Sequence, residues 1–543
     1  MSAPKEEFQL VDEKILKAEE RVLRAKENLC KFLTERNSLL SICRLPNEVL
    51  GLIITLGVQE IRAGMRPDPF QSMPVSWLWS THVCRHWRAV ALECPAIWDT
   101  PDFTRPKLAR EMLLRAKSTP LYVYAWISHS NNSLATVNVR KALQDMTHIA
   151  EIRIRFTVSS GARVVSGLVQ PAPKLRSLHI INGQMGTSFK LPDNLLAAEA
   201  PRLREMSIQD CLLPWEHVST TLSGLRSLCL HGGVYNRIPH SKLKAFLQAL
   251  QTMQWLEELE IVDIFPYGES VTVKTITTLP RLTSVKVLGT PTGCISLLNG
   301  VTFSSKASVD VAVLVSDPGD CSKALPILPH LATITKDYIK SVCIDLTQNI
   351  LHPRFVLKVF DEDLPDGPAL NPSRFIFKLT EREGRRLSES GVYGFAKRTL
   401  EALPLSYLPA IHLALGDGLT AADYLHYFGS LTKLHTMSVE GSCAHVFVQA
   451  FCSSSIFPPG SSNIPFSSLQ SIILRNIDFD RSWRPGKDTI EIVLLVSLRY
   501  RFSSGIPVQY LGIRECYNFD IDQRSELVEV VEEVDWDGRF IES

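Results

Sequence analysis

Residues 203–211 read LREMSIQDC, and residues 508–516 read VQYLGIREC. In both stretches aliphatic side chains stand at positions one, four and six, and a cysteine stands at position nine. Positions four and six share one face of a strand, because successive strand side chains point to opposite faces. Each stretch therefore predicts a short strand with one buried face.

The same aliphatic spacing occurs eleven times along the chain. The copies begin at Ile149, Leu175, Leu203, Leu225, Leu256, Leu282, Ile339, Leu408, Leu434, Leu469 and Val508. The first six begin 26, 28, 22, 31 and 26 residues apart, and the gaps of 57 and 69 residues that follow each have room for two steps. A period of this size predicts stacked units that share one continuous core.

The repeated string resembles the divergent leucine-rich repeats over residues 150 to 516. The resemblance implies an α/β fold with a curved solenoid, in which the ninth-position side chain bonds the turn backbone from inside. Cys211 and Cys516 are therefore predicted to be structural and buried. The strand residues between the aliphatics would line the inner face of the solenoid. These residues carry no dominant charge and so do not indicate a particular class of ligand. We expect an unknown protein substrate to bind at His179, Glu205, Glu258 and Lys286.

A second pattern covers residues 44–100. In LPNEVL, residues 45–50, Pro46 suits the first turn of a helix, where a missing amide hydrogen costs little. A broad apolar face follows, made of Val49, Leu50, Ile53, Ile54 and Val58. Residues 63–74 contain three prolines and a glycine and break the helix. A second helix is predicted through residues 75–94, with Trp79, Val83, Trp87 and Ala91 at steps of four.

LPNEVL followed by VCRHWRAVALECPAIW, residues 83–98, resembles the F-box, especially the version widespread in fungal proteins. The resemblance implies a three-helix unit that binds a Skp-type adaptor and, through it, a cullin–RING ubiquitin ligase. The long connector at residues 62–75 departs from the general family pattern and is usual in the fungal subset. The matching positions assign adaptor contacts to Leu45, Pro46, Val49, Leu50, Ile53, Val83, Trp87, Pro95 and Trp98. On physical grounds alone, a helical hairpin that caps the next domain is equally compatible.

Residues 5–40 contain no glycine or proline and predict one long helix. Apolar residues recur at alternating steps of three and four, the spacing of a coiled-coil seam, from Phe8 to Phe32. A self-associating coiled coil and a helix packed on its own chain or on a partner are both compatible. The second is favoured, because extra leucines widen the stripe and Arg21 would face Lys26 of a parallel twin.

Length, net charge and cysteine content limit the possible partners and the cellular compartment. The 543 residues exceed one domain and carry a net charge of +1, which gives no reason to expect nucleic acid or a membrane as partner. The N-terminus lacks an apolar signal core, and the 12 cysteines are scattered without a CxxC pair, so we expect reduced thiols in the cytoplasm or nucleus. The predicted domains are 1–43, 44–100, 101–516 and an acidic cap or tail at 517–543, with the cap favoured by its valines.

No sequence pattern of an enzyme stands out. Nucleotide-binding, zinc-protease and serine-hydrolase motifs are absent from the sequence. His82 and His86 are four residues apart but have no third ligand nearby, and Gly416-Asp417-Gly418 reads more simply as a turn before a helix capped by Thr420. We therefore predict no metal, no cofactor and a non-catalytic substrate adaptor of a Skp–cullin–F-box ligase; the alternative is a non-degradative scaffold that binds the Skp-type adaptor.

Overall fold

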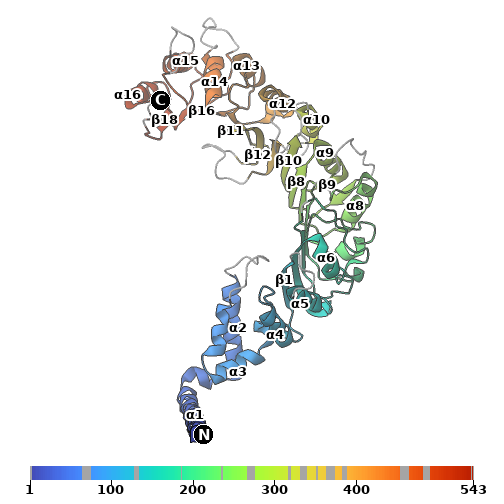
Figure 1. Cartoon of the computed structure of the whole chain (residues 1–543). Coiled ribbons are helices and arrows are strands. Elements are labelled where there is room, and N and C mark those ends of the chain that lie inside the picture. Colours follow the sequence, from blue (N-terminus) through green and yellow to red (C-terminus); the bar gives the residue numbers. More distant parts are fainter. Residues whose placement is uncertain are drawn as a thin grey trace. The chain divides into compact units, whose positions relative to one another are not determined.

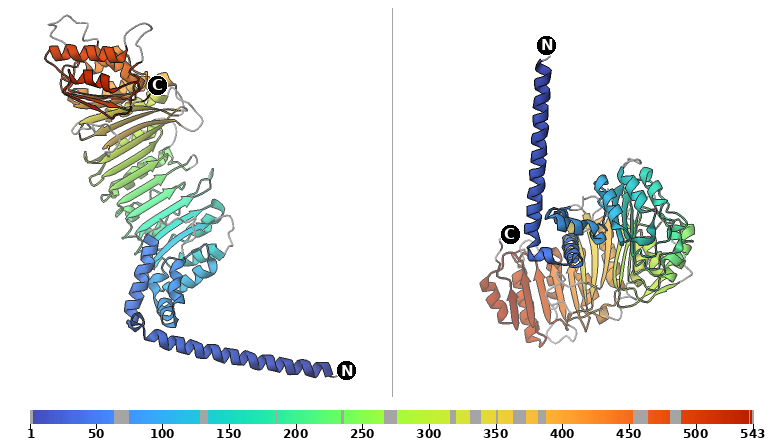
Figure 2. Two further views of the ribbon diagram at one scale, coloured as in Figure 1. Left: turned by 90° about the vertical axis from the view of Figure 1, so that its left-hand side faces the viewer. Right: turned by 90° about the horizontal axis from the view of Figure 1, so that it is seen from below.

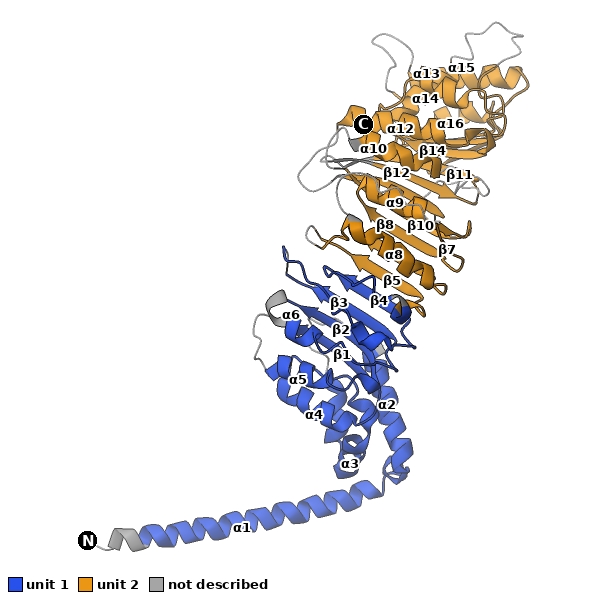
Figure 3. Ribbon diagram, turned by 90° about the vertical axis from the view of Figure 1, so that its right-hand side faces the viewer, with its two compact units in different colours: residues 1–221 blue, residues 222–543 orange. Residues whose placement is uncertain are grey.

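The computed structural model forms two compact units, residues 1–221 and 222–543 (Figure 3). The boundary falls inside the region predicted as one solenoid. The structure describes residues 3–63, 75–127, 134–184, 186–233, 236–265, 276–315, 320–330, 339–349, 352–362, 373–381, 388–452, 464–480, 489–539 and 541. Most of the connector at 62–75 lies outside these ranges.

Unit 1 begins with helices (Figure 1). They are α1 (Ala3–Ser38), η1 (Ser41–Arg44), α2 (Asn47–Ala63), η2 (Ser76–His82), α3 (Arg85–Glu93), η3 (Pro95–Ile97) and α4 (Pro106–Ala116). The long helix predicted over residues 5–40 is confirmed as α1. Its seam residues, from Phe8 to Phe32, are largely exposed. Self-association and binding to a partner therefore remain the two alternatives for this helix.

The single helix predicted over residues 75–94 is wrong. The chain forms the 3-10 helix η2, then turns through Cys84, whose φ of −159° and ψ of 174° are extended, before α3 begins. The three-residue period of a 3-10 helix puts Trp77 and Ser80 on the buried side and leaves Trp79 half exposed. Trp77 packs edge-on against Trp98, with ring centroids 5.1 Å apart.

The rest of unit 1 is a parallel sheet with helical connections. Its strands lie in the order β1 (Leu121–Ile127), β2 (Ile149–Phe156), β3 (Ser177–Asn182) and β4 (Glu205–Gln209). The connections hold α5 (Leu134–Ala142), η4 (Met146–His148), α6 (Val158–Val165) and η5 (Leu195–Ala198), and α7 (Ser219–Leu222) follows.

Unit 2 is built on a larger sheet. Along the sheet lie β5 (Ser227–His231), β6 (Glu258–Val262), β8 (Ser284–Gly289), β10 (Ser308–Val315), β13 (Phe375–Glu381), β12 (His352–Phe360), β11 (Ser341–Asn349), β14 (Ala410–Ala414), β15 (Thr436–Glu440), β16 (Ser471–Arg475), β17 (Tyr510–Arg514) and β18 (Glu533–Trp536). β7 (Thr277–Leu279) and β9 (Val301–Phe303) form a separate parallel pair.

Helices cover one face of the unit 2 sheet. They are α8 (His240–Thr252), α9 (Pro291–Gly300), α10 (Asp320–Ala324), α12 (Glu389–Ala402), α13 (Ala421–Phe428), α14 (Ser442–Cys452), α15 (Ile490–Ser503) and α16 (Ile521–Val528), with short turns η6 (Leu325–Ile327) and η7 (Leu405–Tyr407). Figure 3 shows helices of this unit in front of the strands. The left panel of Figure 2 shows the green and yellow strands from the other side, where helices do not cover them.

The eleven aliphatic strings fall on eleven strands: β2 to β6, β8, β11 and β14 to β17. Every aliphatic residue of every copy is buried. The chain is therefore a mixed helix and strand protein with a large, mostly parallel sheet, compatible with an α/β repeat architecture. The period predicted these strands because each repeat buries the same three positions against its neighbours.

The two degenerate repeats predicted between Ile339 and Leu408 are wrong. β12 runs antiparallel to both β11 and β13, so this segment is a meander inserted into the parallel sheet. Buried residues recur at every second position along most of β12 and β13, as Phe355, Leu357 and Val359 do on β12. This period of two fits a strand without the longer repeat string.

The acidic C-terminal segment closes the sheet of unit 2. β18 pairs in parallel with β17, and Val531 and Val534 are buried beside it. The Trp536 ring lies edge-on to Phe519, with centroids 5.4 Å apart. This packing covers the end of the core, as the last unit of a repeat stack requires.

Candidate partner-binding site

Helix α2 is apolar on two faces. Leu50, Ile54 and Val58 are buried in unit 1. Val49, Leu52, Ile53 and Leu56 are between 40% and 58% exposed, and we name these four residues the α2 outer face. Their spacing of three, one and three residues makes one continuous stripe on a helix. An apolar stripe left open to water marks an interaction surface.

The end of α2 is fixed by a partly buried polar contact. Arg62 forms an ion pair with Asp99, and its Nη2 donates a hydrogen bond of 2.9 Å to the backbone oxygen of Ile97. Its guanidinium lies 5.9 Å from the centre of the Trp77 ring. Burial raises the pKa of Asp99, and Arg62 opposes that rise by favouring the carboxylate. These contacts hold α2 in place, so the α2 outer face is presented on a rigid helix.

The predicted adaptor contacts divide into accessible and buried residues. Pro46, Val49, Ile53 and Val83 are exposed, and Leu45 and Pro95 are partly exposed. Leu50, Trp87 and Trp98 are buried, and the Trp98 Nε1 donates a hydrogen bond of 3.0 Å to the Ala91 backbone oxygen. These three side chains build the core that supports the surface and offer little area to a partner.

Sequence reasoning missed Leu52 and Leu56, although both lie on the α2 outer face. The signal was present, because Leu52 follows Val49 by three residues and Leu56 follows Ile53 by three. A helix that is apolar on both sides leaves the buried face ambiguous until its neighbours are known.

The predicted target-binding residues of unit 1 lie on adjacent strands. Glu205 on β4 is exposed, and His179 on β3 is half-buried, contrary to the exposure expected of it. A His179 ring nitrogen lies 2.7 Å from the Ser177 Oγ. Burial, with a smaller effect of Arg153, lowers the pKa of His179 to about 4. The imidazole is therefore neutral at pH 7 and acts as a hydrogen-bonding group.

The predicted target-binding residues of unit 2 are both exposed. Glu258 on β6 accepts a hydrogen bond of 3.0 Å from the Ser227 hydroxyl. Lys286 on β8 places its Nζ 4.0 Å from the Glu260 Oε2. A partner can therefore reach both of these exposed side chains.

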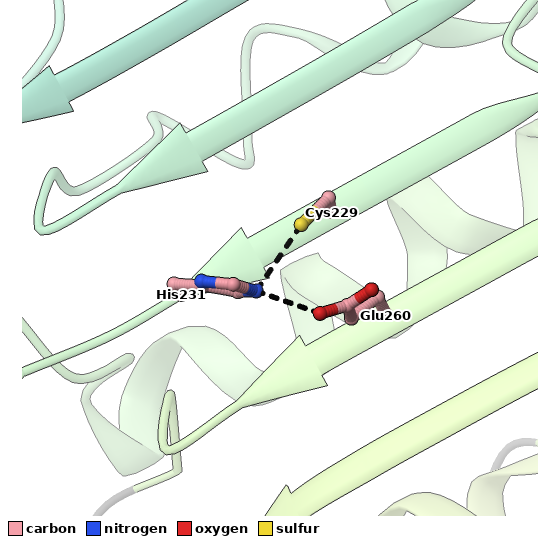
Figure 4. Close-up of side chains that lie close together, drawn as sticks. All are labelled: Cys229, His231 and Glu260. Carbon is pink, nitrogen blue, oxygen red and sulfur yellow. Dashed lines mark hydrogen bonds and ion pairs between the residues drawn. The ribbon is translucent and has the colours of Figure 1, made fainter. Parts of the chain in front are cut away.

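A cluster that the sequence did not predict lies beside Lys286. Figure 4 shows Cys229 and His231 on β5 pointing toward Glu260 on β6. The His231 Nε2 lies 3.2 Å from the Cys229 Sγ and 2.9 Å from the Glu260 Oε1. The hydrogen bond to Cys229 is the largest cause that raises the pKa of His231 to about 9, against burial and with help from Glu260.

Another polar group links β14 and β15. The His412 Nδ1 lies 2.8 Å from the Ser438 Oγ, and its Nε2 lies 3.6 Å from the Glu440 carboxylate. His412 and Ser438 are both buried, which denies a substrate access to the hydroxyl. Burial lowers the pKa of His412 to about 4, and Arg475 and Lys358 add to the effect. This arrangement joins two strands.

The two repeat cysteines lie inside the protein as predicted. Burial raises the pKa of the Cys211 thiol to about 12 and that of Cys516 to about 11. The Cys516 Sγ contacts the backbone oxygens of Arg514 at 3.3 Å and Leu474 at 3.6 Å. Such contacts match the turn-bonding role expected of that position.

The other candidate motifs lead to no site in the described part of the chain. His82 and His86 belong to no group of three metal-ligand side chains among the residues that the structure describes. Thr420 caps α13 by a reciprocal bond with Asp423, and Gly416 has a φ of +55°, so the glycine motif forms a turn and a helix start. None of the described helices is long and apolar enough for a membrane crossing.

Comparisons with known proteins establish no family. No family model and no curated protein matches the chain. A TLR13–ssRNA13 complex shares 13% identity over 73% of this chain and 46% of that chain, less than half its length, with a TM-score of 0.28. A Rad7 and Elc1 complex in yeast shares 12% identity over 86% of this chain and 96% of that chain, with a TM-score of 0.23.

Proposed function

We propose that this protein is a non-catalytic substrate adaptor of a Skp–cullin–F-box ubiquitin ligase, acting in the cytoplasm or nucleus. Residues 44–100 would dock on a Skp-type adaptor, and the strand faces would select a protein target. The observation that carries the proposal is the α2 outer face, an open apolar stripe within the segment that resembles an F-box.

The size of the stripe suits a protein partner. Full burial of an aliphatic side chain is worth about 1.5–3 kcal/mol, and four such residues are about half exposed here. Covering them would contribute several kcal/mol to association, which is the scale of a few hot-spot contacts. Pro46, which directly precedes α2, and Val83 are also exposed and would be available to the same partner.

The target would bind at surfaces other than the α2 outer face. His179 and Glu205 in unit 1, and Glu258 and Lys286 in unit 2, offer hydrogen bonds and both charge signs. Substitution of such strand residues leaves the buried aliphatic positions unchanged, so target choice can vary while the core is kept. The chain itself would supply binding and positioning, and the ligase would supply the chemistry.

The test is purification of the full chain from cells, with and without a proteasome inhibitor, followed by mass spectrometry. The chain should capture a Skp-type adaptor, a cullin and at least one protein that accumulates when the proteasome is blocked. The double variant Ile53→Asp, Leu56→Asp should lose the adaptor and the cullin.

Leu114→Asp is the matched control, because Leu114 is a helical leucine of unit 1 that is 56% exposed and lies on α4. Adaptor capture that survives in the folded double variant would overturn the docking assignment. Adaptor capture without any target whose level depends on the ligase would favour the non-degradative scaffold.

A further inference from the structure

We propose that Cys229, His231 and Glu260 form a binding site for a borderline-soft divalent cation of the zinc type. The ligands would be the Cys229 thiolate, the His231 Nε2 and the Glu260 carboxylate, with a water in the fourth position. The three side chains lie on the side of the strands away from the helices drawn behind them (Figure 4), the side that the left panel of Figure 2 shows uncovered.

The strand register brings the three side chains together. Cys229 and His231 are two residues apart on β5, so both side chains point to the same face. Glu260 is the residue of β6 that stands directly opposite Cys229. Neighbouring strands lie about 4.8 Å apart, which is within the reach of one ion.

The donor atoms are close to the spacing that zinc requires. Bond lengths of about 2.3 Å to sulfur and about 2.0–2.2 Å to nitrogen or oxygen set tetrahedral ligand atoms about 3.4–3.6 Å apart. In the structure the two contacts of the His231 Nε2 are 3.2 and 2.9 Å, and all three ligand atoms lie within 4.8 Å of one another. Small rotations of these half-buried side chains would admit the ion.

The contacts of His231 favour a metal site over a catalytic cysteine at this cluster. A Cys–His–carboxylate relay uses both ring nitrogens, one toward the thiol and one toward the acid. Here the same nitrogen, Nε2, faces both Cys229 and Glu260. Three donors directed at one point are arranged for a shared ion. When the metal binds, the proton held between these groups leaves, because metal ligands must be deprotonated.

The ligand set selects the kind of ion. Thiolate and imidazole favour zinc and similar transition metals, whereas calcium and magnesium prefer oxygen ligands. Lys286, with its Nζ 4.0 Å from the Glu260 Oε2, balances the carboxylate charge when no cation is present. A bound cation would therefore compete with this ammonium for Glu260.

The experiment is equilibrium dialysis of the full chain against Zn²⁺, with Co²⁺ as a spectroscopic probe and Mg²⁺ as a hard-ion control. We expect one tightly bound Zn²⁺, a thiolate-to-cobalt charge-transfer band and no comparable binding of Mg²⁺. Cys229→Ser, His231→Gln and Glu260→Gln should each weaken Zn²⁺ binding at least about 100-fold, because loss of even a supporting contact costs 10–100-fold. Cys84→Ser and His435→Gln are the matched controls and should bind as the parent does.

Two further measurements do not depend on the ligand variants. Zn²⁺ should protect Cys229 from alkylation, resolved by mass spectrometry from the other cysteines. Lys286→Ala should tighten Zn²⁺ binding roughly fivefold, since it removes the competing attraction between the ammonium and the Glu260 carboxylate, about 1 kcal/mol at 4.0 Å in water. Absence of stoichiometric binding, binding that survives in Cys229→Ser and His231→Gln, no protection of Cys229, or unchanged affinity in Lys286→Ala would each overturn the site.

Discussion

Leu50 and Ile53 are three residues apart on α2, yet Leu50 is 0% exposed and Ile53 is 40% exposed. The two side chains therefore serve opposite purposes. Leu50 joins the core of unit 1, and Ile53 belongs to the α2 outer face. The buried side of α2 therefore stabilises the docking segment, and the exposed side is available to a partner.

Alanine at these two positions should give different results. Leu50→Ala should cost about 2–5 kcal/mol of local stability, because it leaves a cavity in the core. Ile53→Ala should change stability by no more than about 0.5 kcal/mol, as expected for a surface position. Hydrogen–deuterium exchange in peptides from α3 measures both effects. Equal destabilisation by the two variants would mean that the faces of α2 are assigned wrongly.

The buried imidazole of His412 should make unit 2 sensitive to acid. Its pKa is about 4 in the folded protein, below the ordinary value of 6.5, so the unfolded chain binds more protons between these values. Its contribution is complete above pH 6.5 and is lost as the pH falls toward 4, by up to about 3 kcal/mol.

Comparison of the parent with His412→Asn tests this effect. The asparagine amide can still bond Ser438 but does not titrate, so the variant should lose less unfolding free energy between pH 7 and pH 4.5. Chemical denaturation at several pH values gives the two curves. Parallel curves would show that His412 does not titrate as its burial requires.

The repeat cysteines should react slowly with alkylating reagents. Burial raises the pKa of Cys211 to about 12 and that of Cys516 to about 11, which suppresses the reactive thiolate. In the native protein both should label at least about 100-fold more slowly than the half-buried Cys84. Mass spectrometry after timed quenching gives the individual rates, and rapid labelling of both would contradict their interior positions.

The sequence predicted the periodic parts of the fold. Eleven aliphatic strings became eleven strands because each string has the same burial requirement as its neighbours. It did not predict the meander at β11, β12 and β13, whose alternating residues, such as Phe355 and Leu357, lack the repeat spacing. It also did not predict the break at Cys84, because the steps of four from Trp79 to Ala91 fit a continuous helix equally well.

Site residues that lie close together in the sequence could be predicted, and those brought together only by the fold could not. Val49 and Ile53 could be found by a motif, and Leu52 and Leu56 by helical spacing once the buried face was known. Cys229 and His231 are two residues apart in the sequence, but Glu260 is far from them along the chain. Their proximity depends on the register of β5 against β6, which a single sequence does not contain.

Target recognition can be tested separately in each unit. Glu258→Ala with Lys286→Ala should weaken capture of a target that binds unit 2, with a stability cost within about 0.5 kcal/mol for each exposed residue. His179→Ala with Glu205→Ala is the corresponding pair in unit 1, where loss of the bond to Ser177 makes the stability cost larger. Adaptor binding should be unchanged in both.

The matched control for target capture is Lys244→Ala with Glu389→Ala, two exposed residues on α8 and α12. Parallel pull-downs and thermal melts of the three double variants measure both quantities. Targets retained by both strand variants, or lost equally in the control, would place recognition elsewhere on the chain.

The most direct test of the account is calorimetric titration of the purified full chain with a recombinant Skp-type adaptor. We predict a one-to-one complex that the Leu114→Asp control retains. Ile53→Asp with Leu56→Asp should weaken it by about 2 kcal/mol or more, roughly 30-fold in affinity, because apolar anchors at an interface are lost. No binding by the folded parent chain, or equal affinity in the parent and the double variant, would contradict docking through the α2 outer face.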